Sequence, residues 1–396
     1  MIALAQIQGL LTWLAATSAL IYWFRSWQRS RTPGVLAMVR ALAALDVAIV
    51  VGPDYGVYGW LFGVETLPNY VTHVAALFST YYLQVFVLYL AHPADTIPPK
   101  IRPRTRLLIV AQLVLAALYL AGPVRGDHPS IASTSGNHAV IVAYLAVFVL
   151  YIGLAMVDVI IVSRHARDLP AGHLRLGLRL LRWGAMCGLA FAVHKAVASL
   201  VRHVDLWPPL VPLFHSVVPG ILTTAGLLLM TTGIMVPAVG PRLQLRRHHR
   251  ALLPLWRDLV DFAPTVQFTE PAARRLWSGR GDIAARVRHR LTEIHDVLVG
   301  PLQPYIDPQV HAAALGRAEA SPVRGATAAA TAQAVTIATA LNAARDETPV
   351  NAVSPVAFTP PDVTDIRDEA AWLASVATVY AHLHTKEQPS HVARAR

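Results

Sequence analysis

Ionisable side chains stand inside long apolar stretches of this 396-residue sequence, where they could carry chemistry. An ionised group costs roughly 2.5–3.5 kcal/mol to insert at the centre of a membrane helix, so each needs a partner, a water-filled cavity or a function. Such groups bind ions, relay protons or recognise polar solutes in membrane proteins. The candidate site residues are Arg40, Asp46, Asp158, Arg179, Arg182, His194 and Lys195.

Seven apolar stretches hold these residues, and they must position them. The stretches cover residues 2–24, 35–51, 69–91, 107–122, 139–163, 176–201 and 211–236. A bilayer core needs about 20 apolar helical residues, and only the second and fourth stretches are short of that length. Because lipid offers the backbone no hydrogen-bond partner, each stretch is expected to be a helix. The sequence therefore predicts an all-α protein with a seven-helix transmembrane bundle.

The orientation of this bundle follows from the distribution of basic residues. Fourteen of them follow the first, third, fifth and seventh stretches: Arg25, Arg29, Arg31, Lys100, Arg102, Arg104, Arg106, Arg164, Arg167, Arg175, Arg242, Arg246, Arg247 and Arg250. The opposite loops carry only Arg125 and Arg202. Basic loops stay cytoplasmic, which predicts a multi-pass plasma-membrane protein with its N-terminus outside and its C-terminus in the cytoplasm. The net charge of +11 is then a topological signal and does not indicate nucleic-acid binding.

Depth within the predicted spans separates the candidate residues. Arg179 and Arg182 lie within two turns of the cytoplasmic boundary, where long side chains reach the headgroups, and this interpretation is favoured for both. Asp46 and Lys195 lie at similar depth in the outer half of spans two and six. If these spans are neighbours, the two side chains form an ion pair. Such a pair is either part of a substrate or proton path or a static structural pair. The alternative to pairing is that the two side chains reach separately for outer headgroups.

No catalytic, metal or cofactor site is expected. Cys187 is the one cysteine, which excludes an intramolecular disulfide and any cysteine-cluster metal site. The pairs His289/Glu293 and His382/His384 do not complete a zinc ligand set. A phosphoacceptor role for His295 is disfavoured, because no nucleotide-binding domain follows it. The sequence therefore predicts that the protein is not an enzyme.

Beyond residue 240 the hydrophobic pattern changes from membrane length to amphipathic periods. Helices are expected at residues 252–262, 282–299, 308–318, 326–344 and 362–384, with a proline-rich connection at 347–361. In the 282–299 helix, Arg290 and Glu293 are assigned to the polar face. The predicted organisation is a membrane domain at 1–240, a cytoplasmic helical domain at 241–385 and a disordered tail at 386–396.

Three short motifs follow the seven spans: Leu-Pro-Leu-Trp at 253–256, Arg-Leu-Thr-Glu-Ile-His-Asp at 290–296 and Leu-Gln-Pro-Tyr at 302–305. In this order they resemble an actinobacterial family of seven-span membrane proteins described as transporters. In that family a cytoplasmic C-terminal domain has no assigned function. The resemblance implies transport of an unidentified substrate.

A membrane receptor or signalling scaffold is the competing interpretation. Seven helices with the N-terminus outside and a helical cytoplasmic domain suit a relay to a cytoplasmic protein partner. Transport is weakened by the lack of an internal duplication or paired broken helices. The lipid bilayer is the one partner that the sequence predicts directly. No nucleic acid is expected, and the sequence does not identify a ligand.

Overall fold

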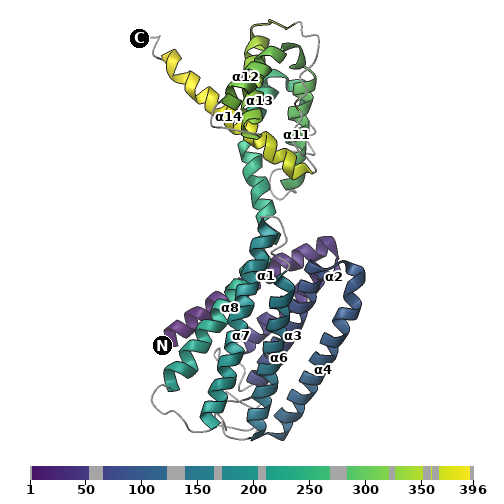
Figure 1. The fold of residues 1–396 in the computed structure, drawn as a ribbon, viewed down its shortest axis with the longest axis vertical. Coiled ribbons are helices and arrows are strands. Elements are labelled where there is room, and N and C mark those ends of the chain that lie inside the picture. Colours follow the sequence, from purple (N-terminus) through teal and green to yellow (C-terminus); the bar gives the residue numbers. More distant parts are fainter. Residues whose placement is uncertain are drawn as a thin grey trace. The chain divides into compact units, whose positions relative to one another are not determined.

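The computed structural model describes residues 2–52, 66–122, 139–164, 172–203, 211–267, 283–320, 326–350, 358 and 365–392. Within these ranges it contains twelve α-helices, three short 3-10 helices and no β-strand (Figure 1). The predicted all-α class is therefore confirmed. The chain divides into two compact units, Met1–Ala238 and Val239–Arg396.

Each of the seven apolar stretches coincides with a helix of the first unit. These helices are α1 (Ile2–Ser30), α2 (Pro33–Val51), α3 (Leu67–Ala91), α4 (Ile97–Ala121), α6 (Ala139–Ser163), α7 (His173–His203) and α8 (Val211–Ala251). In the part of the chain that the structure describes, six helical segments are long and apolar enough to cross a membrane. They lie in α2, α3, η2 with α4, α6, α7 and α8. The protein is thus a multi-pass membrane protein, and α1 is a further long helix outside that set.

The surface of the first unit is that of a protein surrounded by lipid. Twenty-six large apolar side chains of its described residues are exposed, against Leu243 and Val299 in the second unit. They lie on the outer faces of the helices, such as Leu113 of α4 (65% exposed) and Leu150 of α6 (63%). Water would penalise so much exposed apolar area, whereas hydrocarbon does not. This difference separates a membrane unit from a water-facing one.

Helix α3 lies at the centre of the first unit, where it packs against α2, α4 and α6. Figure 1 shows α3, α4 and α6 lying side by side along their lengths. Its buried face includes Leu77, Val87 and Leu88, each at most 1% exposed, and the facing surface of α6 includes Tyr144 and Val159. Residues of α3 and α6 are therefore fixed against each other along most of the bundle.

Helices α1 and α2 meet at a two-residue turn. Arg31 takes the left-handed conformation at φ 51°, which ends α1, and Pro33 begins α2 with its fixed φ. The Arg31 amide donates to the Trp27 carbonyl at 2.9 Å, and its guanidinium lies over the Trp27 ring at 4.4 Å. The backbone and the side chain of Arg31 thus both contact Trp27 in the last turn of α1.

Helix α4 begins ten residues earlier than the sequence indicated. It starts at Ile97, so the cations at positions 100, 102, 104 and 106, which the sequence pattern places in a loop, are helical. Pro98 and Pro99 fit the first turn, where their missing N–H groups would be unpaired in any case, and Pro103 is accommodated inside the helix. The fourth predicted span is short because charge and proline interrupt the apolar pattern in the first ten residues of the helix.

Glycines bring α7 and α8 into backbone contact. A Cβ atom on Gly184 would stand 2.4 Å from Cγ of Met230 and 2.9 Å from the carbonyl oxygen of Gly226. One on Gly233 would stand 2.8 Å from the carbonyl oxygen of Gly177. Small residues at helix contacts let membrane helices approach closely enough for van der Waals packing to hold them. These glycines therefore fix the α7–α8 pair.

The second unit is a bundle of short helices with its own apolar core. It contains the end of α8, then α9 (Leu253–Phe262), α11 (Ile283–Val299), α12 (Pro308–Ala320), α13 (Ala326–Arg345) and α14 (Ile366–Val392). Short 3-10 segments lie at Pro264–Val266 and Gln303–Tyr305. All five predicted helices are present, and α14 includes residues 386–392, for which disorder was expected. Most of the proline-rich 347–361 stretch lies outside the described residues.

Two cores and one shared helix define the division of the chain. The first core includes Ile234 of α8, and the second includes Leu245 of the same helix with Leu255, Ile294 and Tyr380. The boundary between the units thus falls within α8 and not in a loop.

Candidate functional site

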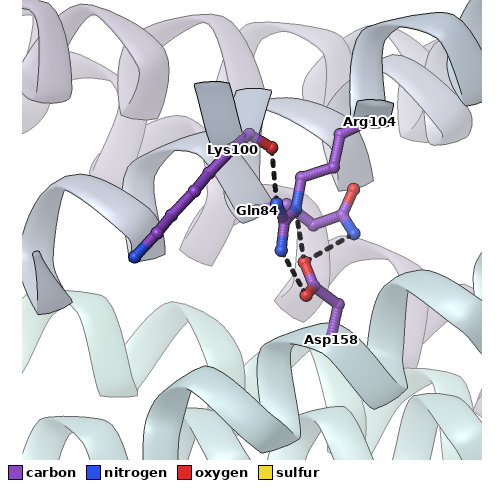
Figure 2. Close-up of polar contacts among 4 residues, drawn as sticks. All are labelled: Gln84, Lys100, Arg104 and Asp158. Atoms are coloured by element: carbon purple, nitrogen blue, oxygen red, sulfur yellow. Dashed lines mark hydrogen bonds and ion pairs between the residues drawn. The ribbon is translucent and has the colours of Figure 1, made fainter. Parts of the chain in front are cut away.

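A bidentate ion pair joins α4 to α6 inside the membrane unit. Nε of Arg104 donates to Oδ2 of Asp158 at 2.7 Å, and Nη2 donates to Oδ1 at 2.5 Å (Figure 2). The two side chains are only 20% and 24% exposed. Parallel donation from a planar guanidinium to both carboxylate oxygens is the strongest form of this interaction and fixes both side chains in orientation.

Helix α3 contributes Gln84, which contacts the carboxylate of this ion pair. Nε2 of the buried Gln84 donates to Oδ2 of Asp158 at 3.0 Å, so this oxygen accepts from two helices. The remaining Nη1 of Arg104 donates to the Lys100 carbonyl at 2.6 Å. The ammonium of Lys100 points away from the carboxylate (Figure 2). Gln84, Arg104 and Asp158 are called the charged tie below, because they link α3, α4 and α6.

A second polar contact lies beside the charged tie. The Tyr81 hydroxyl of α3 is 2.8 Å from Oγ1 of Thr105, which in turn donates to the Ile101 carbonyl. Thr105 follows Arg104 directly, and Tyr81 precedes Gln84 by one turn. A polar α3–α4 contact therefore lies directly beside the charged tie.

The charged tie lies near one end of the bundle. Asp158 is five residues from the end of α6 at Ser163, about 8 Å along the helix axis at 1.5 Å per residue. Arg104 is 17 residues from the other end of α4, about 26 Å away, which places it near the boundary of a hydrocarbon core about 30 Å thick. This end, where α3 and α6 finish and α4 begins, is called the inner end. The basic-residue pattern predicts that it is cytoplasmic.

The opposite end of the α3–α6 contact has a polar tie of its own. Nδ1 of His73 is 2.9 Å from the Tyr144 hydroxyl, and the His73 ring packs against Phe148 with 4.1 Å between ring centroids. Along α3, His73 lies 11 residues before Gln84; along α6, Tyr144 lies 14 residues before Asp158. The two ties are therefore about 17–21 Å apart along the helices.

Between these ties the α3–α6 contact contains a buried phenol without a partner. Tyr151 is 3% exposed, and its hydroxyl has no hydrogen-bond partner among the described residues. It lies seven residues from both Tyr144 and Asp158, so all three share one face of α6. Thr80, on the same face of α3 as His73 and Gln84, is 8% exposed and bonds its own helix at the Ala76 carbonyl. A buried unpaired hydroxyl is costly and needs an explanation.

The structure gives Asp46 a different partner from the one expected. Oδ1 of Asp46 accepts a hydrogen bond from the Thr17 hydroxyl of α1 at 2.7 Å. The ion pairs among the described residues do not include Asp46 with Lys195. The Lys195 ammonium lies 5.9 Å from the centroid of the Phe191 ring on its own helix. Similar depth was therefore not enough to pair these side chains.

The other predicted residues are dispersed over the bundle. The exposed Arg40 guanidinium lies 5.6 Å from the centroid of the Tyr82 ring. Arg179 is exposed and Arg182 is partly exposed on α7, while His194 is 9% exposed. Of the seven candidates, only Asp158 belongs to the charged tie, and the other six do not gather with it.

Sequence reasoning missed Arg104 and Gln84, which complete the site. Arg104 falls in a predicted loop, and the neutral Gln84 carries no charge signal. One signal was depth: Arg104 lies just before the predicted fourth span, and Asp158 lies just inside the same boundary of the fifth. The matched depth that failed for Asp46 and Lys195 would have found this pair.

In the second unit two of the three resemblance motifs, at 253–256 and 290–296, meet at one buried carboxylate. Glu293 is 2% exposed and accepts a hydrogen bond from the Trp256 indole N–H at 2.6 Å. The Arg290 guanidinium lies 4.6 Å from the centroid of the Trp256 ring and donates to the His249 carbonyl at 2.5 Å. Tyr305 packs edge-on against Phe262. The assignment of Glu293 to an exposed polar face was wrong, because α9 covers that face.

His295 also has a partner across the second unit. Its Nε2 is 2.7 Å from Oε1 of Glu369 on α14, and the two side chains are 39% and 28% exposed. Within the described ranges, no three His, Cys, Asp or Glu side chains are grouped so that they could hold a metal ion.

In the comparison with known proteins, a family model matches part of the second unit. Residues 242–383 form a domain that matches the family of unknown function DUF6545. This match covers less than half of the chain. No curated protein and no solved structure shows significant similarity to the chain.

Proposed function

We propose that the first unit moves a small polar solute or ion across the membrane, and that the charged tie is its inner gate. The main observation behind this proposal is the bidentate Arg104–Asp158 pair, which with Gln84 connects three helices at one end of the bundle. The substrate is not assigned. The resemblance to seven-span proteins described as transporters supports the same conclusion.

The chemistry of the tie suits a contact that opens and closes. Removing one partner of a buried ion pair leaves an uncompensated charge, whereas a well-packed apolar replacement of the whole pair is often neutral or stabilising. A charged pair is therefore not needed merely to hold three helices together. Its side chains are about one-fifth to one-quarter exposed, so water can solvate both charges when they separate.

The α3–α6 contact above the tie provides the proposed path. The His73–Tyr144 contact closes its outer end, the charged tie closes its inner end, and the unpaired Tyr151 hydroxyl lies between them. In this mechanism the ties open alternately. A polar solute that enters from outside supplies a partner for Tyr151, and separation of Asp158 from Arg104 and Gln84 releases the solute inward.

A receptor remains the second candidate, and one observation favours it. Helix α8 contributes Ile234 to the core of the first unit and Leu245 to that of the second, without a break in the helix. A continuous helix can transmit a rotation or tilt to a cytoplasmic domain. For either function, we propose that the second unit acts by binding a cytoplasmic partner, not by catalysis.

Cysteine accessibility distinguishes a path from a closed contact. In a Cys187→Ala background, Thr80→Cys places a thiol one turn from Gln84 on the outer side of the tie. In sealed vesicles of each orientation, its labelling by a charged, membrane-impermeant thiosulfonate is followed with and without Asp158→Asn. We expect Asp158→Asn to raise labelling from the inner side at least tenfold. Arg106→Gln, an exposed cation on the same helix as Arg104, is the matched control and leaves the rate unchanged.

The reciprocal exchange Arg104→Asp with Asp158→Arg restores the pair in reverse and is expected to restore slow inner labelling. Labelling of Thr80→Cys from neither side, with or without the tie, contradicts a path and favours the receptor. Osmotic shrinkage and reswelling of proteoliposomes in glycerol, urea and glycine then measures permeation of three small polar solutes that differ in charge and hydrogen bonding. Faster solute entry is expected with Asp158→Asn than with Arg106→Gln.

A further inference from the structure

The second unit contains a group of guanidinium side chains that form no ion pair with a carboxylate of the described residues. Arg286 and Arg290 are one turn apart on α11 and therefore share a face of that helix. Arg257 follows Trp256 on α9, and the Trp256 ring lies under the Arg290 guanidinium. Arg257, Arg286 and Arg290, together with His249 of α8, are called the arginine cluster. None of its cations forms an ion pair with a carboxylate in the described ranges.

Electrostatic interactions place the members of the cluster together. Arg257 and Arg286 both repel the Arg290 charge, and Arg286 and Arg290 both act on His249. Arg290 itself is fixed by its hydrogen bond to the His249 carbonyl. Burial is the main cause that lowers the pKa of Arg290 to about 10, and the neighbouring arginines lower it further, while Glu293 opposes them. Cations are thus held close together at an energetic cost.

The nearby acidic groups form no ion pair with these cations among the described residues. Glu293 is almost fully buried and already accepts the Trp256 N–H. Asp258, the next residue after Arg257, accepts a hydrogen bond from the Tyr380 hydroxyl at 2.7 Å. Asp261 is exposed on α9 and forms no ion pair with the cluster among the described residues.

Two buried nitrogens of the cluster, the Arg286 donor and one ring nitrogen of His249, have no hydrogen-bond partner among the described residues. Nε of Arg286 and Nδ1 of His249 are inaccessible to solvent and have no hydrogen-bond partner in the part of the chain that the structure describes. Buried donors without acceptors are rare in folded proteins and often mark the place of a missing group. The chemistry of that group follows from the donors. An anion that accepts several hydrogen bonds from guanidinium forks fits these groups, and this is the recognition chemistry of phosphate.

We propose that the arginine cluster is a binding site for a phosphate-bearing anion, with Arg257, Arg286 and the His249 ring as ligands and Arg290 as the fixed central cation. The site is independent of the proposed transport function, because all of its residues lie in the second unit. Arg246, Arg247 and Arg250, which stand in the last turns of α8, add to its positive potential. The phosphate belongs either to a lipid headgroup or to a soluble metabolite.

The test uses the full chain in an uncharged detergent and two probes. One is dihexanoyl phosphatidylglycerol below its micellar concentration, which carries a phosphodiester on a lipid. The other is inorganic phosphate, with chloride at matched ionic strength as the reference. Affinity is measured by thermophoresis for the natural chain, for Arg257→Gln/Arg286→Gln, and for Arg288→Gln. Arg288 is an exposed arginine of the same helix and is the matched control.

We expect the double variant to weaken binding of the effective probe at least tenfold and Arg288→Gln to change it less than twofold. Binding of the lipid alone identifies a headgroup site, and binding of inorganic phosphate assigns a soluble ligand; either result supports the proposal. Equal losses of affinity in the double variant and in Arg288→Gln would show ordinary charge screening and overturn the proposal. Binding of chloride as tight as that of the probe would overturn it for the same reason. Binding of neither probe also overturns it. The melting temperature of each variant, measured without probe, confirms that the cluster variants are folded.

Discussion

The indole of Trp256 donates its N–H to the buried carboxylate of Glu293 at 2.6 Å, and the same ring carries the Arg290 guanidinium on its face. One tryptophan therefore contacts both Arg290 and Glu293 of the 290–296 motif. It satisfies the carboxylate by a hydrogen bond and the cation by a cation–π contact. The Leu-Pro-Leu-Trp and Arg-Leu-Thr-Glu-Ile-His-Asp motifs are therefore in direct contact in the fold.

Trp256→Phe is expected to destabilise the second unit by about 1.5–3 kcal/mol, because a buried carboxylate loses a charge-assisted hydrogen bond. The matched control is Trp372→Phe, which removes a neutral indole bond of 3.0 Å to Gln333 and is expected to cost about 1 kcal/mol. Hydrogen exchange of the full chain in nanodiscs measures both at α9, α11 and α13. A smaller loss for Trp256→Phe than for Trp372→Phe would contradict this account of Glu293.

Much of the fold was predictable because each helix carries its own signal. Membrane helices are long and apolar, and the amphipathic period from Ile283 to Leu298 defines α11. Contacts between helices were not predictable to the same extent. Glu293 looked solvent-facing because periodicity shows the faces of one helix and not what covers them. Asp46 bonds Thr17, and Asp158 bonds Arg104, since the neighbours of each helix are set by packing of the whole bundle.

The α7–α8 contact gives a sharp steric prediction. In Gly184→Ala the new methyl group would lie 2.4 Å from Cγ of Met230 and 2.9 Å from the backbone of α8, so the helices must move apart. We expect a clear fall in melting temperature and in folded yield in detergent. Gly153→Ala is the control, because its Cβ would meet Ala192 at an ordinary 3.7 Å. That variant should be neutral or slightly stabilising, since alanine favours a helix over glycine by roughly 0.5–1 kcal/mol. Equal behaviour of the two variants would exclude close α7–α8 packing.

His311 predicts a pH dependence of the α12–α13 contact. Burial lowers the pKa of His311 from its usual 6.5, and Nδ1 lies 3.2 Å from Oγ1 of the buried Thr336. A histidine with a lowered pKa in the folded state binds fewer protons than in the unfolded chain. Its contribution to stability is therefore present above pH 6.5 and is lost as the pH falls below it.

The measurement for His311 is the difference between the natural chain and His311→Gln. Exchange protection of α12 and α13 is expected to fall from pH 7 to pH 5 more steeply in the natural chain. Thr336→Val keeps the histidine and removes only its partner, so the steeper fall should persist. If the difference in exchange protection between the natural chain and His311→Gln stays constant from pH 7 to pH 5, a group other than His311 titrates.

The last prediction concerns membrane topology. Because α4 begins at Ile97, the loop between α3 and α4 is probed at Pro93 and not at the basic residues that follow. Basic loops predict that Pro93 and Thr32 face the cytoplasm, whereas positions 58, 127 and 205, which lie outside the described residues, face outward. A single cysteine at each position in a Cys187→Ala background is labelled in intact cells with a membrane-impermeant maleimide. We expect labelling at the last three positions and none at Pro93→Cys or Thr32→Cys until the membrane is permeabilised. Position 104 is unsuitable as a loop probe, because Arg104 lies inside α4 and in the charged tie.

A thiol at Ala5, near the start of α1, decides the number of spans. Labelling of intact cells there indicates seven crossings with the N-terminus outside, and protection indicates that α1 does not cross and six helices do.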